Sequence, residues 1–84
     1  MKHATLETLA GFEGLLGQLR AIPGLTEKRP GVFYRKSKAF LHFHEDPEGL
    51  FADYRPGEEW LRLEVSGTAA QAELVAAIRA ALPA

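Results

Sequence analysis

The spacing of the hydrophobic residues changes twice along this chain, and this limits what the chain can fold into. From about Thr5 to Ala21, apolar residues recur every three or four positions, as on one side of an α-helix. From Val32 to Val65 they alternate with polar residues, as in β-strands with one buried face. From Thr68 to Leu82 the helical spacing returns. The sequence therefore predicts a helix, a group of strands and a second helix.

Three turn segments divide the alternating region into strands. Asp46-Pro47-Glu48-Gly49 has Asp, Pro and Gly at the positions that a type I turn favours. Pro56-Gly57-Glu58-Glu59 marks a loop, and we expect a two-residue turn at Ser37-Lys38. Strands joined by such short connections are antiparallel and form a meander. The four expected strands cover residues 32–36, 39–44, 50–55 and 60–65.

Length and composition fit one small globular domain. The chain has 84 residues, of which 46% are hydrophobic and 25% are charged. Each expected helix has one apolar stripe, so both helices should pack on the same face of the sheet. We therefore expect residues 1–84 to form a single α+β domain. Its architecture would be a two-layer sandwich, αββββα, with a four-stranded antiparallel meander and two helices on one face.

Composition also excludes several classes of protein. The chain contains no Cys, which excludes disulfides, thiolate nucleophiles and Cys-based zinc sites. Ten Lys and Arg nearly balance eleven Asp and Glu, giving a net charge of −1, which is unlike a strong polyanion binder. No apolar run approaches the roughly 20 residues of a membrane-spanning helix, and the first residues show no signal-peptide pattern. We expect a cytoplasmic protein with no membrane partner.

The sheet face turned away from the helices is the candidate functional surface. Exposed aromatic clusters usually mark an interface, and aromatic residues with arginine are enriched at protein interfaces. We therefore expect a small interaction protein that forms a homodimer through this face. Strict alternation assigns ten candidate interface residues to it, namely Phe33, Arg35, Phe40, His42, His44, Phe51, Asp53, Arg55, Trp60 and Arg62.

Two histidines support a second hypothesis, a ligand-binding or metal-binding site. His42 and His44 are two residues apart on one expected strand, so both side chains project from the same face. If Asp46–Gly49 closes a tight hairpin, Asp53 lies opposite His42. Asp53 would then be a third metal ligand or the acceptor that orients a ligating histidine. The sequence demands no cofactor, but a divalent metal at His42, His44 and Asp53 stays open, as do acid–base and purely structural roles.

A third hypothesis is weak binding of single-stranded nucleic acid or DNA, by stacking on the aromatic residues of an open sheet.

A basic cluster at the first hairpin either discourages edge-to-edge aggregation or binds a phosphate. No phosphate-binding glycine loop is present, and Ser37 and Ser66 are turn residues rather than nucleophiles. A binding protein is thus favoured over an enzyme. The basic cluster consists of Lys28, Arg29, Arg35, Lys36 and Lys38.

Several short motifs resemble known bacterial families. The run from Ile22 to Lys28, the strand and turn from Val32 to Phe40, and Trp60-Leu61-Arg62-Leu63 before a last helix resemble the MmcQ/YjbR-like family. The segment from Phe40 to His44 is similar to the Phe-x-His-x-His strand of the bacterial "luciferase-domain" family of unknown activity. The first resemblance implies DNA binding, by analogy of fold alone. Neither resemblance supplies a catalytic residue.

Overall fold

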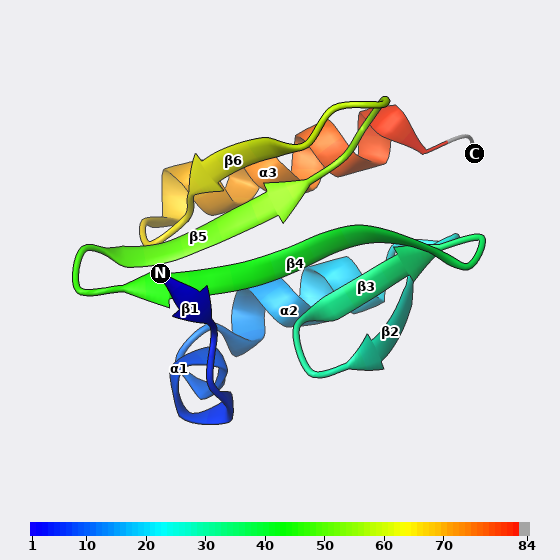
Figure 1. Ribbon diagram of the computed structural model, residues 1–84. Coiled ribbons are helices and arrows are strands. Elements are labelled where there is room, and N and C mark those ends of the chain that lie inside the picture. Colours follow the sequence, from blue (N-terminus) through cyan, green and yellow to red (C-terminus); the bar gives the residue numbers. More distant parts are fainter. Residues whose placement is uncertain (83–84) are drawn as a thin grey trace.

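Six strands form one antiparallel sheet, with three helices beside it, in the computed structural model, which describes residues 1–82 (Figure 1). The α+β class and the antiparallel sheet are thus confirmed. The sheet order is β2-β3-β4-β5-β6, and β1 pairs with β4 outside this path. The strands are β1 (Lys2–His3), β2 (Thr26–Arg29), β3 (Val32–Arg35), β4 (Lys38–Asp46), β5 (Gly49–Tyr54) and β6 (Leu61–Glu64). The helices are α1 (Leu6–Ala10), α2 (Glu13–Arg20) and α3 (Thr68–Ala81).

The first expected helix is two helices. Thr5 caps α1, because its side-chain oxygen accepts a hydrogen bond from the Thr8 amide. Helical conformation then stops at Phe12, whose φ of −124° and ψ of 29° are not helical. Gly11, which favours helix ends over helix interiors, lies at this break. The chain therefore changes direction, and α1 runs at a steep angle to α2 (Figure 1).

Strands β1 and β2 were not expected from the sequence. Thr26-Glu27-Lys28-Arg29 shows no apolar alternation, and β1 has only two residues, so neither segment carries a strand pattern. β2 is the exposed edge strand next to β3. Glu27 of β2 forms an ion pair with Arg20 of α2. Basic and acidic residues on such an edge are typical of strands that avoid pairing with other molecules.

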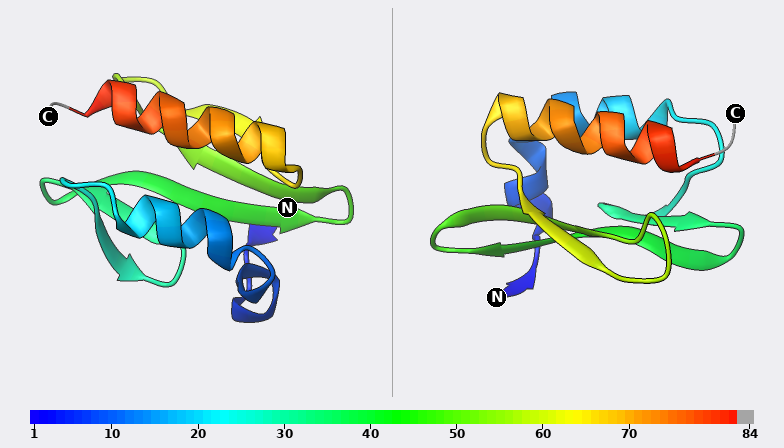
Figure 2. Two further views of the ribbon diagram at one scale, coloured as in Figure 1. Left: turned by 180° about the vertical axis from the view of Figure 1, so that it is seen from behind. Right: turned by 90° about the horizontal axis from the view of Figure 1, so that it is seen from above.

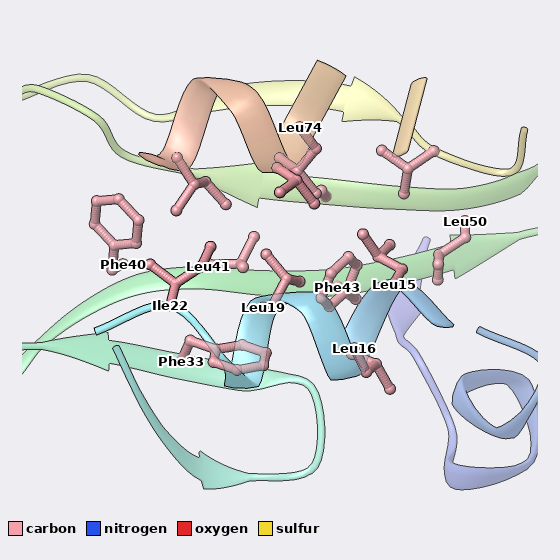
Figure 3. Packing of buried hydrophobic residues seen from close by; sticks show 14 of the residues in the cluster. Leu15, Leu16, Leu19, Ile22, Phe33, Phe40, Leu41, Phe43, Leu50 and Leu74 are labelled. Carbon is pink, nitrogen blue, oxygen red and sulfur yellow. The ribbon is translucent and has the colours of Figure 1, made fainter. Parts of the chain in front are cut away.

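One hydrophobic core lies between the sheet and the two longer helices. Helices α2 and α3 cover the same face of the sheet (Figure 2), as the two apolar stripes predicted. Leu15, Leu16 and Leu19 of α2 point into this layer, opposite buried side chains of β3, β4 and β5 (Figure 3). The other side of the sheet, called the outer face below, has no helix over it (Figure 2).

The hairpin of β4 and β5 has the expected register. Glu45 pairs with Leu50, and Asp46 with Gly49, so the Pro47-Glu48 turn is closed as its sequence predicted. His42 therefore pairs with Asp53. This pairing places both side chains on the outer face, next to each other.

The face assignment of β3 was wrong by one residue. The turn is Lys36-Ser37, with Arg35 opposite Lys38, and β4 has one extra residue, Phe40, at a β-bulge. Phe33 and Phe40 consequently point toward the helices, with 0% and 4% of their surface exposed (Figure 3). Burial of a phenylalanine contributes about 2–3 kcal/mol, which favours this bulged register over strict alternation.

The β3–β4 turn is conformationally strained. Lys36 has a φ of 49° and Ser37 a φ of 69°, as a type I′ turn requires, but Asn-Gly fits these values better. We expect the double change Lys36→Asn with Ser37→Gly to raise the free energy of unfolding by about 1 kcal/mol. Urea denaturation measures this difference. A lower midpoint for the double variant would contradict the assigned turn.

Candidate metal centre

All three histidines of the chain meet on the outer face. His42 and His44 project from the same side of β4, because they are two residues apart on a strand. His3 comes from β1, which pairs with the end of β4 so that His3 lies directly opposite His44. We call these three residues the histidine cluster.

The three imidazoles are close enough to share one ion. One nitrogen of each ring can be chosen so that the three nitrogens lie within 4.8 Å of one another. The ring centres of His3 and His44 are 4.5 Å apart, and those of His42 and His44 are 4.8 Å apart. A tetrahedral zinc ion with bonds of 2.0–2.1 Å holds its nitrogens about 3.3 Å apart. Binding would therefore require the side chains, above all the exposed His3, to rotate and bring the nitrogens closer together.

Two of these rings have buried nitrogens without a partner. Nδ1 of His42 and Nδ1 of His44 are both inaccessible to solvent, and neither forms a hydrogen bond with any group of residues 1–82. Nδ1 of His44 is 2.9 Å from Oδ2 of Asp53, at ion-pair distance. Buried polar atoms in proteins nearly always have a partner. Nδ1 of His44 therefore faces Asp53, which leaves the other nitrogen of this ring, Nε2, for a ligand.

Asp53 is the buried acid beneath the cluster, with only 7% of its surface exposed. Its two oxygens accept hydrogen bonds from Arg62, from Nε at 2.6 Å and from Nη2 at 2.9 Å. Hydrogen bonding to Arg62 lowers the pKa of Asp53 below its usual value, although burial opposes this shift. Asp53 is therefore a fixed carboxylate anion in contact with His44.

The short strand that contains His3 is held in place by hydrogen bonds of the residues that directly follow it. The amide of Ala4 donates to the carbonyl oxygen of Phe43 at 3.0 Å. The carboxylate of Glu45 accepts from the Thr5 amide at 2.7 Å and from the Thr8 hydroxyl at 2.8 Å. These bonds dock the start of α1 on β4, and they position His3 over His44.

A hollow adjoins the histidine cluster on the side of β6. It is lined by His42, Asp53, Trp60, Leu61 and Arg62. The Trp60 ring is 5.0 Å from the His42 ring and is 42% exposed. A molecule bound in this hollow would therefore contact the histidine cluster from one side, next to an aromatic wall.

The stability of the metal-free protein should fall in mild acid. Burial and the charge of His44 lower the pKa of His42 below 6.5; His3 and Arg62 act in the same direction, and Asp53 opposes them. Below about pH 6.5 the unfolded chain binds more protons at this residue than the folded chain does, so acidification favours unfolding. We expect a lower urea midpoint at pH 5.5 than at pH 7.5.

The control for this pH effect is His42→Gln. The variant lacks the titrating group, so its midpoint should fall less between the two pH values. An equal fall in both proteins, or no fall in the wild type, would contradict the role given to His42.

The structure divides the expected interface residues into three groups. Phe33 and Phe40 are buried in the core, so their assignment to an exposed face was wrong. Phe51 and Asp53 remain on the outer face with the two histidines of β4, and Arg62 and Trp60 border it. Arg35 and Arg55 lie instead at the far end of the sheet, in a separate hollow.

Sequence analysis missed His3. Nothing in Lys2-His3 indicates a strand, and its pairing with β4 joins residues about forty positions apart. One signal was available in the sequence, namely the number of histidines. Two of the three were expected to lie together on one strand, so the position of the third, His3, still had to be explained.

Comparison of the chain with protein-family models, curated proteins and solved structures found no match. The resemblance to the MmcQ/YjbR-like and "luciferase-domain" families therefore stays a prediction. None of the helices in residues 1–82 has the length and apolar character needed to cross a membrane.

Proposed function

We propose that this chain binds a divalent transition-metal ion, most readily Zn²⁺, through His3, His42 and His44. The observation that supports this most is the convergence of all three histidines, with ligand nitrogens within 4.8 Å of one another. These three histidines come from two separate strands, β1 and β4, and they are all the histidines of the chain.

The chemistry of the cluster favours zinc over harder cations. Neutral imidazole suits Zn²⁺, Cu²⁺ and Ni²⁺, whereas Mg²⁺ and Ca²⁺ prefer oxygen ligands. The lowered pKa of His42 keeps its ring neutral, which is the form that binds a metal. Asp53 contacts His44 and is held by Arg62, as expected for the carboxylate that orients a ligating histidine. Asp53 is therefore assigned a supporting position, and His3 takes the place that the sequence offered to Asp53.

The fourth coordination position would remain open. Three protein ligands with a water in the fourth position are typical of catalytic zinc sites, whereas structural sites have four protein ligands. His42 lines the hollow beside Trp60, so a small molecule bound there would lie next to one of the three proposed ligands. A site of this kind binds a metal reversibly and can present a metal-bound water to a ligand.

The test is a metal titration of protein produced without a polyhistidine tag. Co²⁺ replaces Zn²⁺ and gives visible absorption bands when tetrahedral, and Zn²⁺ should displace it. We expect His3→Ala to weaken metal binding by about 100-fold or more. Loss of a residue that only hydrogen-bonds to a metal ligand already costs about 10–100-fold, and His3 is itself a proposed ligand. His42→Ala and His44→Ala should weaken binding to a similar extent.

Lys2→Ala is the matched control for this titration. Lys2 is the neighbour of His3 in β1, but it pairs with Glu45 and points to the opposite side of the strand. Its loss should leave the affinity unchanged. Absence of the cobalt bands in the wild type, or an equal loss in Lys2→Ala and His3→Ala, would overturn the proposal.

Self-association is a second candidate, on a smaller surface than the sequence suggested. With Phe33 and Phe40 in the core, the exposed large apolar residues near the outer face are Trp60, at 42%, and Leu61, at 45%. Leu61 begins the edge strand β6 and Trp60 directly precedes it, so both lie where a second copy could pair. Light scattering should then give twice the mass of 9.2 kDa, and Leu61→Lys should restore that of one chain. A single-chain mass for the wild type at high concentration would exclude this candidate.

A further inference from the structure

A second hollow lies at the end of the sheet where the β3–β4 turn meets the loop between β5 and β6. Its volume is about 660 Å³, which is within the range of small-molecule sites. Four cationic side chains line it, together with one acid, Glu58. The four cations are Arg35, Lys36, Lys38 and Arg55, and we call this site the basic hollow.

The charges of the basic hollow are not balanced within the described part of the chain. None of its four cations forms an ion pair with a carboxylate of residues 1–82, and Glu58 forms none either. Like charges held close together repel one another, and the repulsion is stronger next to protein than in bulk water. An anion in the hollow would remove this repulsion.

One cation is already held in position. Nη2 of Arg55 donates to the carbonyl oxygen of Ala39 at 3.0 Å. The Arg55 guanidinium also stacks on Trp60, 5.0 Å from the centre of the ring. A guanidinium fixed in this way loses little side-chain entropy when it binds an anion, and its fork of N–H groups matches two oxygens of a phosphate.

The strained turn contributes a second cation. Lys36 has a positive φ in a turn that a smaller residue fits better. Strain of this kind often occurs where a side chain is needed for binding. The conformation holds Lys36 and Lys38 at the rim of the same hollow as Arg55.

We propose that the basic hollow binds the phosphate group of a small phosphorylated molecule. Four cations with no acid partner fit a multiply charged tetrahedral anion better than a single carboxylate. A long polyanion fits less well, because the chain has a net charge of −1 and the opposite end of β4 is acidic. This proposal does not depend on the histidine cluster, because none of its residues lines the basic hollow.

The test is a titration of ¹⁵N-labelled, metal-free protein with pyrophosphate. At about 50 mM salt, where ionic contacts are only partly screened, we expect shifts confined to the residues of the basic hollow. Arg55→Gln should weaken binding at least about tenfold, as should Lys36→Asn with Ser37→Gly, because each removes a charged hydrogen-bond donor. The double variant is expected to fold at least as well as the wild type, so unfolding cannot explain its loss of binding.

Two controls make the outcome decisive. Lys2→Gln removes one positive charge at the other end of β4 and should bind pyrophosphate as the wild type does. His3→Ala should also bind normally, which separates this site from the metal site. The proposal is overturned if pyrophosphate causes no localised shifts, if Lys2→Gln loses as much affinity as Arg55→Gln, or if a single-stranded oligonucleotide binds more tightly than pyrophosphate with an affinity that grows with its length.

Discussion

Phe33→Ala should lower the free energy of unfolding by about 3–5 kcal/mol, because it empties a fully enclosed site in the core. The Phe33 ring is 0% exposed and lies between β3 and the helices (Figure 3). A small domain has only about 5–15 kcal/mol of stability in total, so this single change could unfold a large share of the molecules. Urea denaturation followed by circular dichroism measures the loss.

The matched variant for this experiment is Phe51→Ala. Phe51 pairs with His44 on the outer face and is only partly buried, so its truncation should cost about 1 kcal/mol. Strict alternation places both rings on one face and predicts similar losses, whereas the bulged register predicts a large difference. If Phe33→Ala does not fold, Phe33→Leu gives a smaller, measurable loss. Equal effects of Phe33→Ala and Phe51→Ala would contradict the register of β3.

Asp53→Asn should weaken metal binding about 10–100-fold without removing a proposed ligand. The amide keeps the size of the side chain but loses the charge that contacts His44 and accepts two hydrogen bonds from Arg62. Its NH₂ group would also face the donors of Arg62, so the free energy of unfolding should fall by about 1–2 kcal/mol. The cobalt titration and urea denaturation measure the two effects separately.

Glu64→Gln is the control for Asp53→Asn. Glu64 pairs with Phe51, so it shares the outer face, but its carboxylate accepts from the Ser66 amide rather than contacting a histidine. The same change of charge at this position should leave metal affinity nearly unaltered. If Asp53→Asn and Glu64→Gln weaken binding equally, the effect of Asp53 is one of general charge, and its assigned position next to His44 is wrong.

The parts of the fold that depend on local pattern were predictable from the sequence. The turn residues from Asp46 to Gly49 set the register of one hairpin, and the pairing of His42 with Asp53 followed from it. The last helix and the shared helix face likewise followed from apolar spacing. In each case the signal is a pattern of residues near one another in sequence.

The remaining features depend on interactions that no local pattern records. The turn at Lys36-Ser37 and the bulge at Phe40 are selected by burial of Phe33 and Phe40 in the core, which alternation alone does not represent. The third member of the histidine cluster is placed by a two-residue strand that pairs across about forty positions. Two of three cluster residues were therefore predictable, and His3 was not.

The position of His3 has a kinetic consequence. β1 contributes two residues to the sheet, and a strand this short, with few hydrogen bonds, opens far more often than the centre of a fold. An ion held by β1 and β4 would leave when β1 lifts, while His42 and His44 stay in place on the long central strand. The lifetime of the bound ion would then equal the waiting time for this opening. Strengthening the Glu45 contacts with the start of α1 would lengthen that lifetime without any change to the ligands.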